Sequence, residues 1–342
     1  MLTKLILLKS NNILRALSFE SSLFESSDFQ IINYILFWIS NPCVVIGRHQ
    51  NPWKEINIPL LKEKKLNFVR RSSGGGTVYH DLGNLNISFL SSKNNCNRNL
   101  NMNIIVNAIN KNWNKNCYVG QRHEIYTGNS LKISGSAARF GRNNAFHHCT
   151  LLLNADLDGL SKILSSQLNI ETNATKSIAS PVTNLHLNYE DVIKAIHLEY
   201  LENYNYHKTE FIDINEGHET NFVDKNVYEK NLNQFSSHKW IYEITPAFTI
   251  RSTVTIGHVI MDVNISCEKA AIHNIFLSDK SLLSDNFPDV IGEHLIGSEL
   301  IANNLYHRLD LAQAKLEFLN KGNLLATDQI VLTEFKRLFY NL

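Results

Sequence analysis

Short apolar runs and longer stretches of helical spacing share the first part of the chain. Apolar residues that recur every three or four positions predict helices at 12–24, 103–113, 157–164 and 189–200. Apolar runs bounded by turn residues predict strands at 5–8, 34–38, 44–47, 131–134, 150–154 and, with a bend at Gly83 and Asn84, at 78–89. Strands and helices do not alternate regularly, so we expect an α+β fold and not a parallel βαβ sheet.

The pattern changes near residue 249. Two strand-like segments, 253–266 and 270–277, predict a hairpin, and helical segments follow at 293–308, 311–319 and 328–340. We therefore expect a larger domain of residues 1–247 and a small α+β domain of residues 248–342. A chain of 342 residues is long enough to bury one large core and a second, smaller one.

Composition argues against several classes of function. The 33 Lys and Arg residues nearly balance the 32 Asp and Glu residues, so no overall field favours nucleic acid or a membrane surface as a partner. No apolar run approaches the roughly 20 residues that a bilayer-spanning helix needs. The five cysteines form no CxxC pair, which predicts reduced thiols and no structural disulfide.

The N-terminal residues admit two interpretations. They carry Lys4, Lys9 and Arg15 and no acid before Glu20, which is the composition of a short organelle-targeting presequence. Residues 5–8 and the helical segment after them also read as a first strand and helix. We favour the strand, in which case almost nothing precedes the folded domain and a cleavable leader is absent, incomplete or already removed.

The most informative segment is RRSSGGGTVYHDLGN at residues 70–84. Three consecutive glycines let the backbone approach a ligand closely, and their N–H groups can form a concavity that binds an anion. The two arginines and the flanking apolar strands favour a phosphate-binding loop over a flexible surface loop. The chain has neither GxxxxGK[ST] nor GxGxxG, so a Walker-type NTPase and a Rossmann dehydrogenase are not supported.

A second segment, KISGSA at residues 132–137, begins with a lysine on a short predicted strand that leads into a turn of small residues. Lys132 can project its ammonium from such a strand into a narrow cleft. Most lysines at strand edges are simply solvated, and this remains the alternative for Lys132 taken alone.

A third segment, FHHCTLL at residues 146–152, places polar residues at the head of an apolar strand. Neighbouring strand residues point to opposite faces of a sheet. His147, His148 and Cys149 therefore cannot all bind one metal ion, and we assign no metal site.

These segments, in this order and spacing, resemble those of the lipoate–protein ligase A and lipoyltransferase family. The resemblance rests on GRHQNPW at residues 47–53, on the glycine-rich segment, on KISGSA and on HHCTLLL, and it extends over the whole chain. It implies a biotin/lipoate ligase-like catalytic domain, a mixed sheet with helices, followed by a small accessory domain. The cysteine in HHCTLL, where bacterial ligases tend to have glycine, makes the chain more similar to the mitochondrial lipoyltransferase branch.

The resemblance also implies which residues act. A free carboxylate is a poor acyl donor, so the family uses lipoate as a mixed anhydride with AMP. By resemblance, Lys132 is the catalytic residue: it bridges the lipoyl carbonyl oxygen and the α-phosphate and stabilises developing charge. The residues expected to bind the nucleotide and lipoyl-AMP, besides Lys132, are Arg71, Ser73, Gly74, Gly75, Gly76, Thr77, Val78 and Tyr79.

A further set is expected to line the lipoyl pocket or to orient the acceptor lysine: Arg48, His80, Asp81, Asn84, Glu124 and His148. The acceptor lysine, with a reference pKa of about 10.4, must lose a proton before it attacks, and Asp81 or Glu124 is a candidate to orient it. One departure from the family is His123-Glu124, where these ligases usually have Asn-Asp. Glutamate keeps the charge but is one methylene longer, so metal handling or acceptor positioning is open at this point.

We therefore predict a lipoyltransferase that moves the lipoyl group from lipoyl-AMP to a specific lysine of lipoyl domains. By resemblance the acceptors are the E2 subunits of 2-oxoacid dehydrogenases and the glycine cleavage H protein. We expect a monomer in mitochondria, with the cytoplasm as the alternative location.

Three other functions stay open. A complete lipoate–protein ligase would also need ATP and Mg. An octanoyl or lipoyl amidotransferase would use Cys149 as a thioester nucleophile, although a buried apolar cysteine fits this position better. A non-catalytic protein would only bind lipoyl nucleotides or lipoyl domains.

Overall fold

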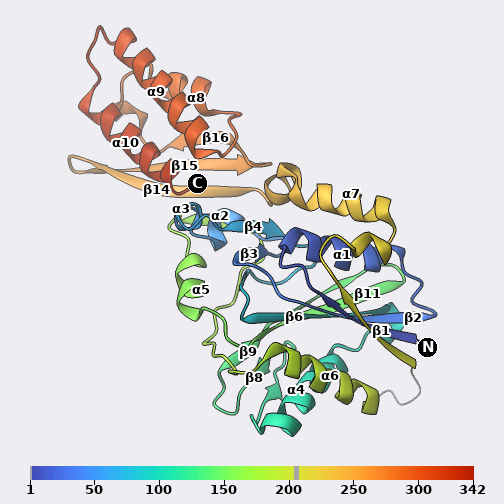
Figure 1. The fold of residues 1–342 in the computed structure, drawn as a ribbon. Helices are drawn as coiled ribbons and strands as arrows, with labels where there is room; N and C mark the ends of the chain where they lie inside the picture. The colour runs from blue at the N-terminus through green and yellow to red at the C-terminus, as the bar shows by residue number, and fades with distance from the viewer. Residues whose placement is uncertain (1, 204–207) are drawn as a thin grey trace. The chain divides into compact units, whose positions relative to one another are not determined.

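The computed structural model describes residues 2–203 and 208–342, which form two compact units (Figure 1). The first unit consists of residues up to 48, 66–161 and 177–237. The second consists of residues 49–65, 162–176 and 238–342. Each unit thus combines stretches that are distant in sequence, and the division into domains 1–247 and 248–342 stays a prediction.

A six-stranded mixed sheet is the centre of the first unit. In spatial order its strands are β10 (Ser136–Phe140), β11 (Asn144–Leu152), β6 (Asn84–Ser92), β2 (Ile32–Trp38), β1 (Leu2–Leu8) and β13 (Lys208–Ile214). β1 pairs in parallel with β2 and β13, whereas β6 pairs antiparallel with β2 and β11. This arrangement confirms the predicted α+β class and the strand favoured for the N-terminal residues.

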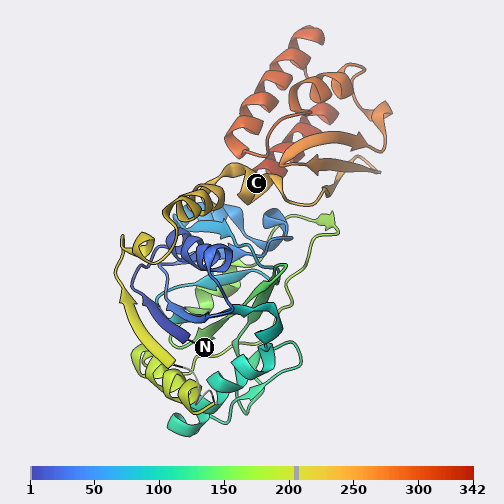
Figure 2. The same ribbon diagram turned by 90° about the vertical axis from the view of Figure 1, so that its right-hand side faces the viewer.

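Helices cover both faces of this sheet (Figures 1 and 2). They are α1 (Ile13–Ser26) with α7 (Lys225–Ser236) on one face, and α4 (Arg98–Trp113) with α6 (Tyr189–Asn203) on the other. The side chains of Asn12 and Asn97 accept hydrogen bonds from first-turn amides and so begin α1 and α4. Asn114, with a φ of 50°, ends α4 in the left-handed conformation.

Two three-stranded sheets also belong to the first unit. One has the order β4 (Asn67–Arg70), β3 (Cys43–Ile46), β5 (Val78–His80), and the other β7 (Tyr118–Val119), β8 (Ile125–Tyr126), β9 (Lys132–Ser134). The predicted strand 78–89 is therefore two strands, β5 and β6. The predicted bend at Gly83 and Asn84 is confirmed as the break between them.

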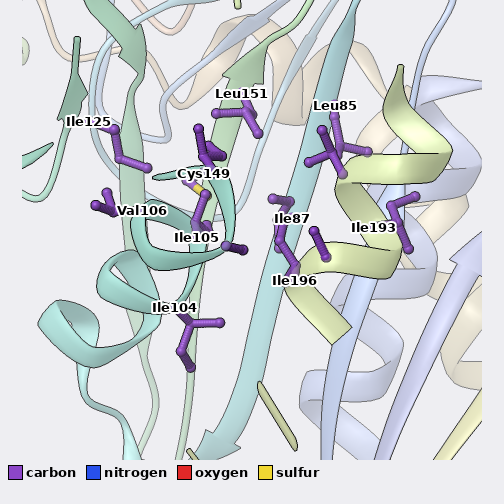
Figure 3. Close-up of a cluster of buried hydrophobic side chains, with 14 of the residues drawn as sticks. Leu85, Ile87, Ile104, Ile105, Val106, Ile125, Cys149, Leu151, Ile193 and Ile196 are labelled. Carbon is purple, nitrogen blue, oxygen red and sulfur yellow. The ribbon is translucent and has the colours of Figure 1, made fainter. Parts of the chain in front are cut away.

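The core of the first unit lies between the main sheet and the helices α4 and α6 (Figure 3). β6 contributes Leu85 and Ile87, α4 contributes Ile105, and α6 contributes Ile196. The side chain of Cys149 on β11 packs in the same cluster. Each fully buried aliphatic side chain of this size contributes about 1.5–3 kcal/mol, so this layer holds β6 and β11 firmly in place.

The second unit is built on an antiparallel sheet of β12 (Ile170–Thr172), β14 (Phe248–Ile256), β15 (Val259–Glu268) and β16 (Ala271–Leu277). Its helices include α2 (Pro52–Glu55), α3 (Ile58–Glu63), α8 (Phe287–Leu295), α9 (Ala302–Leu319) and α10 (Ala326–Tyr340). α5 (Leu157–Ile163) lies where the chain passes from one unit to the other.

Two predictions for the last part of the chain are wrong. The segment 253–266 is not one strand, because Gly257, with a φ of 62°, makes a turn between β14 and β15, and three strands result instead of a hairpin. The two helices predicted at 293–308 and 311–319 are divided in the wrong place: the chain breaks near Gly297, which has a φ of 80°, and one continuous helix, α9, runs from Ala302 to Leu319. A positive φ leaves no trace in the spacing of apolar residues, so the pattern missed both turns.

The remaining sequence-level expectations for the fold can be stated briefly. The other predicted helices and strands are found, with ends displaced by a few residues. All five cysteines are free thiols. Among the helices described, none is both long and apolar enough to cross a bilayer.

Candidate active site

One strand of the main sheet connects the motif segments. His148 and Thr150, two residues apart on β11, point to the same side. His148 Nε2 is 2.9 Å from the hydroxyl of Ser73, in the glycine-rich segment. Thr150 Oγ1 accepts a hydrogen bond of 3.0 Å from the amide of Gly135, in KISGSA. β11 therefore anchors both segments and brings them to one place in the first unit.

Arg71 holds the glycine-rich loop together. Its buried guanidinium donates four hydrogen bonds of 2.6–3.1 Å to Ser73 Oγ and to the carbonyl oxygens of Val45, Gly74 and Gly76. Burial lowers the pKa of Arg71 to about 10, which still leaves the group charged at neutral pH. These four hydrogen bonds use most of the five N–H groups that a guanidinium has, so Arg71 mainly stabilises the protein's own loop. A direct contact of Arg71 with phosphate, which the resemblance implies, stays a prediction.

The amides of the three glycines are not used in contacts within the described protein. In the part of the chain that the structure describes, the N–H groups of Gly74, Gly75 and Gly76 have no protein acceptor. The three residues are partly or fully exposed, and Gly75 has a φ of 86°. Successive free amides around a residue with positive φ form a concavity of the kind that binds phosphate groups.

The KISGSA segment, which begins with Lys132, lies beside this loop. A methyl group placed on Gly75 would be 3.2 Å from Ala137 Cβ, so the loop packs against the KISGSA segment. A methyl group placed on Gly135 would be 3.7 Å from Lys132 Nζ. The ammonium thus lies within van der Waals distance of the small-residue turn.

The backbone and charge of Lys132 are set by its neighbours. Its amide donates to the carbonyl of Pro181 at 2.9 Å, and its carbonyl accepts from the amide of Thr183 at 3.0 Å. Burial lowers the pKa of the Lys132 ammonium, and the carboxylate of Glu124, 3.8 Å from Nζ, opposes that effect. A partly buried ammonium in an accessible turn is suited to an anionic ligand.

The two acids proposed to orient an acceptor lysine, Asp81 and Glu124, have different partners in the structure. The carboxylate of Asp81 accepts hydrogen bonds from the amides of Gly83 at 2.9 Å and Asp156 at 2.7 Å. Both of its oxygens are therefore used by the backbone. Glu124, in contrast, lies next to Lys132.

His80, Asn84 and Trp38 form a buried polar group at the adjoining ends of β5, β6 and β2. His80 Nδ1 is 2.7 Å from the side-chain amide of Asn84, and its ring packs edge-on to Trp38. Burial, with the charge of Arg71, lowers the pKa of His80 to about 3, so the ring is neutral. Among the described residues, Asn84 Oδ1 and Trp38 Nε1 are buried with no protein partner, and a polar ligand atom could satisfy them.

The other candidate residues shape the loop. The amide of Arg48 donates to the carbonyl of Ser73 at 2.8 Å. The amide of Thr77 donates to Ser177 Oγ at 2.9 Å, which ties the end of the loop to a segment far along the chain. Tyr79 lies on β5, and burial raises the pKa of its hydroxyl to about 12. These contacts position the glycines without using their amides.

Sequence reasoning missed Glu20. Its buried carboxylate on α1 is 3.0 Å from His148 Nδ1 and accepts a hydrogen bond from Ser88. Through His148 it therefore supports Ser73 and the glycine-rich loop. The sequence gives only a weak indication of this role. Glu20 is an acidic residue next to Phe19, on the face of the helix that the apolar pattern assigns to the core.

His147 and Cys149 face the opposite side of β11, so the predicted alternation is confirmed. Cys149 is 4% exposed, and burial raises the pKa of its thiol to about 12. Burial lowers the pKa of His147 to about 3. Over residues 2–203 and 208–342 no three His, Cys, Asp or Glu side chains gather so that they could hold a metal ion, and we derive no step through a metal.

Comparison with known proteins gives a consistent picture. The family model described as lipoyl protein ligase A/B catalytic domain matches residues 12–200. The chain is 41% identical over 178 residues to human lipoyl amidotransferase LIPT1, mitochondrial, which covers 52% of this chain and 48% of the human protein. The mouse protein of the same name is 35% identical over 256 residues, 73% and 68% of the two chains. Lipoate-protein ligase A of Psychrobacter cryohalolentis is 31% identical over 301 residues, 84% of each chain.

Solved structures agree on the fold. The crystal structure of P. falciparum LipL1 in complex with lipoate has a TM-score of 0.61 at 22% identity and covers 99% of this chain and 100% of its own. A structure of lipoate-protein ligase A bound with ATP has a TM-score of 0.58 at 22% identity and covers 70% of this chain and 98% of its own. These likenesses confirm the predicted lipoate ligase-like fold.

Proposed function

Since this chain belongs to the family of lipoyl protein ligase A/B catalytic domains, we propose that it moves a lipoyl group from lipoyl-AMP to a lysine of a lipoyl domain. One observation carries the proposal: the free amides of Gly74–Gly76 lie beside the segment that presents the ammonium of Lys132. The amides would hold the phosphate of the adenylate. Lys132 would lie at the junction of phosphate and carbonyl.

The residues then have defined tasks in the reaction. The acceptor lysine loses a proton to solvent, and its neutral amine attacks the lipoyl carbonyl carbon. Negative charge develops on the carbonyl oxygen, where one preorganised donor such as Lys132 is worth about 3 kcal/mol. The bond between the carbonyl carbon and the phosphate oxygen breaks, AMP leaves with that electron pair, and the new amide nitrogen loses a second proton. No covalent enzyme intermediate is needed.

A second candidate function uses a different donor. The human and mouse relatives are named lipoyl amidotransferases, which favours a lipoyl amide, such as a lipoylated lysine of another domain, as the donor. Lys132 can polarise an amide carbonyl in the same way. A route through a Cys149 thioester is not supported, because the thiol is buried and its pKa is raised to about 12.

A third candidate function is a complete ligase, which makes the adenylate itself from free lipoate and ATP. The Psychrobacter relative named lipoate-protein ligase A favours it. The glycine amides and Lys132 fit a nucleotide phosphate in either case. Mg²⁺ would enter with the nucleotide phosphates, since it commonly keeps several waters and few protein ligands.

We further propose the acceptors and the location. E2 subunits of 2-oxoacid dehydrogenases and the glycine cleavage H protein are the acceptors that fit lipoyl transfer. The mitochondrial names of the human and mouse relatives favour a mitochondrial location. We propose that the protein acts as a monomer.

A mass assay with three donors tests these proposals. Apo lipoyl domain is incubated with the protein and with preformed lipoyl-AMP, with lipoate plus Mg-ATP, or with lipoylated H protein. Modification from lipoyl-AMP supports the transferase, modification also from ATP extends it to a complete ligase, and modification only from the lipoylated protein favours the amidotransferase. No modification from any donor contradicts all three and leaves a binding protein.

Two lysine variants accompany the assay. Lys132→Ala should reduce transfer by about 100-fold or more, because the charge on the carbonyl oxygen loses its stabilising donor. The matched control is Lys225→Ala, an exposed lysine on α7 that pairs with Glu229, and it should transfer at the wild-type rate.

A further inference from the structure

A tight turn brings two charged residues to Lys132. It joins β7 to β8: the amide of Gly120 donates to the carbonyl of Glu124 at 2.8 Å, and the amide of His123 donates to the carbonyl of Gly120 at 3.1 Å. His123, with a φ of 59°, takes the left-handed conformation that closes the turn. The turn therefore fixes where Glu124 emerges.

Arg122 clamps the carboxylate of Glu124. Its guanidinium lies 2.7 Å from Glu124 Oε1, and its backbone amide donates to Oε2 at 3.1 Å. Glu124 is only 5% exposed, so the carboxylate has little freedom to turn toward solvent. Two contacts from one residue hold both oxygens, and Oε1 is left facing Lys132 at 3.8 Å.

The space around Glu124 is also restricted. A methyl group placed on Gly120 would be 2.7 Å from the ring of Tyr126 and 3.4 Å from Glu124 Oε2. Tyr126 is the direct neighbour of Lys132 across the β8–β9 pair. Glycine at position 120 thus lets the turn close over Tyr126 and bring the carboxylate to the lysine.

We propose that Glu124, clamped by Arg122, is a positioning residue that holds the ammonium of Lys132 in place for acyl transfer. The proposal rests on the proposed function, because it assigns Glu124 a task in the same reaction. It also assigns a role to Glu124 at the position where this chain has His-Glu and the family usually has Asn-Asp.

The same contacts keep Lys132 charged. Burial alone lowers the pKa of Lys132; the negative charge of Glu124 raises it, and the positive charge of Arg122 lowers it. Residues 181–183, which pair with the backbone of Lys132 on the side opposite Tyr126, carry no charge. Only the ammonium form can stabilise negative charge on a carbonyl oxygen, so activity falls as pH rises through the pKa of Lys132. Because Glu124 raises the pKa of Lys132, it shifts this loss of activity to higher pH.

The first test measures the charge of Lys132 directly and needs no activity. The folded protein is labelled with acetic anhydride at a series of pH values, and the peptide containing Lys132 is quantified by mass spectrometry. Glu124→Gln should move the labelling midpoint of Lys132 to lower pH. Arg122→Gln removes a like charge and should move it to higher pH. Unmoved midpoints in both variants would overturn the proposal.

The matched control is Glu210→Gln. Glu210 lies at the same 3.8 Å from a lysine, Lys4, but this pair is much more exposed, with side-chain exposures of 29% for Lys4 and 53% for Glu210. Its removal should leave the labelling of Lys132 unchanged. Glu124→Asp keeps the charge and should retain a midpoint nearer to that of the wild type.

The second test measures transfer across the same pH range with the donor that the three-donor assay identifies. Glu124→Gln should slow transfer by about 10- to 100-fold, as expected when a reacting group is misplaced, and should move the descending limb of the profile to lower pH. If labelling shifts but the wild type transfers nothing, the proposed function fails and the pairing stands. If the wild type transfers and Glu124→Gln matches it in rate and profile, the positioning role fails alone.

Discussion

Gly74–Gly76 and Gly83 belong to one sequence motif but have different surroundings. The amides of the three consecutive glycines have no acceptor among the described residues, and a methyl group on Gly74 would meet nothing within 4 Å. Gly83 is enclosed: its carbonyl accepts from the amides of Leu153 and Asn154, and a methyl group on it would be 2.1 Å from the Asn154 carbonyl oxygen. The same residue type thus leaves room for a ligand in one place and for the chain itself in the other.

The largest effect expected from this comparison is on stability, at Gly83. Gly83→Ala forces a methyl group into the backbone at the end of β11, which the core holds in place. We expect a loss of about 3 kcal/mol in the free energy of unfolding, measured by urea denaturation. Gly74→Ala is the control and should change it little. A loss below about 1 kcal/mol at Gly83 would mean that the two glycines do not differ as described.

The next effect is on transfer, at Gly75. A methyl group there would be 3.0 Å from the Arg71 guanidinium and 3.2 Å from Ala137 Cβ, at a backbone φ of 86°. Gly75→Ala should slow transfer by about 10- to 100-fold by displacing the free amides, and cost only about 1 kcal/mol of stability. Equal transfer rates for Gly75→Ala and Gly74→Ala would contradict the assigned role of the loop.

The smallest effect on transfer is expected at Cys149. Cys149 belongs to a motif, as Gly75 does, but its side chain packs in the hydrophobic core of the first unit (Figure 3). Cys149→Ala should leave the transfer rate within about twofold of the wild type and cost about 1 kcal/mol of stability. Loss of transfer without loss of stability would instead support the thioester route.

The sequence predicted local features well and distant contacts poorly. Apolar spacing predicted α1, α4 and α6, because each has a buried face, and alternation on β11 predicted that His147 and His148 point apart. The pairing of Glu20 with His148 could not be predicted, because it joins residues that only the completed sheet brings together.

The candidate site shows the same division. Glycine content and the family resemblance identified the glycine-rich loop and Lys132 as residues of interest. The contacts of Arg71 with the loop depend on which way the loop carbonyls turn, and the difference between Asp81 and Glu124 depends in part on the amide of Asp156, which is far away in sequence. The spacing of residue types along the sequence predicts neither of these features.

The most direct test of the central claim observes the glycine amides themselves. The protein, with its 15 glycines, is labelled with ¹⁵N-glycine, and amide spectra are recorded during titration with a non-hydrolysable analogue of lipoyl-AMP. The amides of Gly74, Gly75 and Gly76 should shift on binding, while that of Gly217, which follows β13 at the opposite edge of the main sheet from β10, should not. Binding of the analogue with unchanged signals from Gly74–Gly76 would contradict the claim that this loop holds the phosphate.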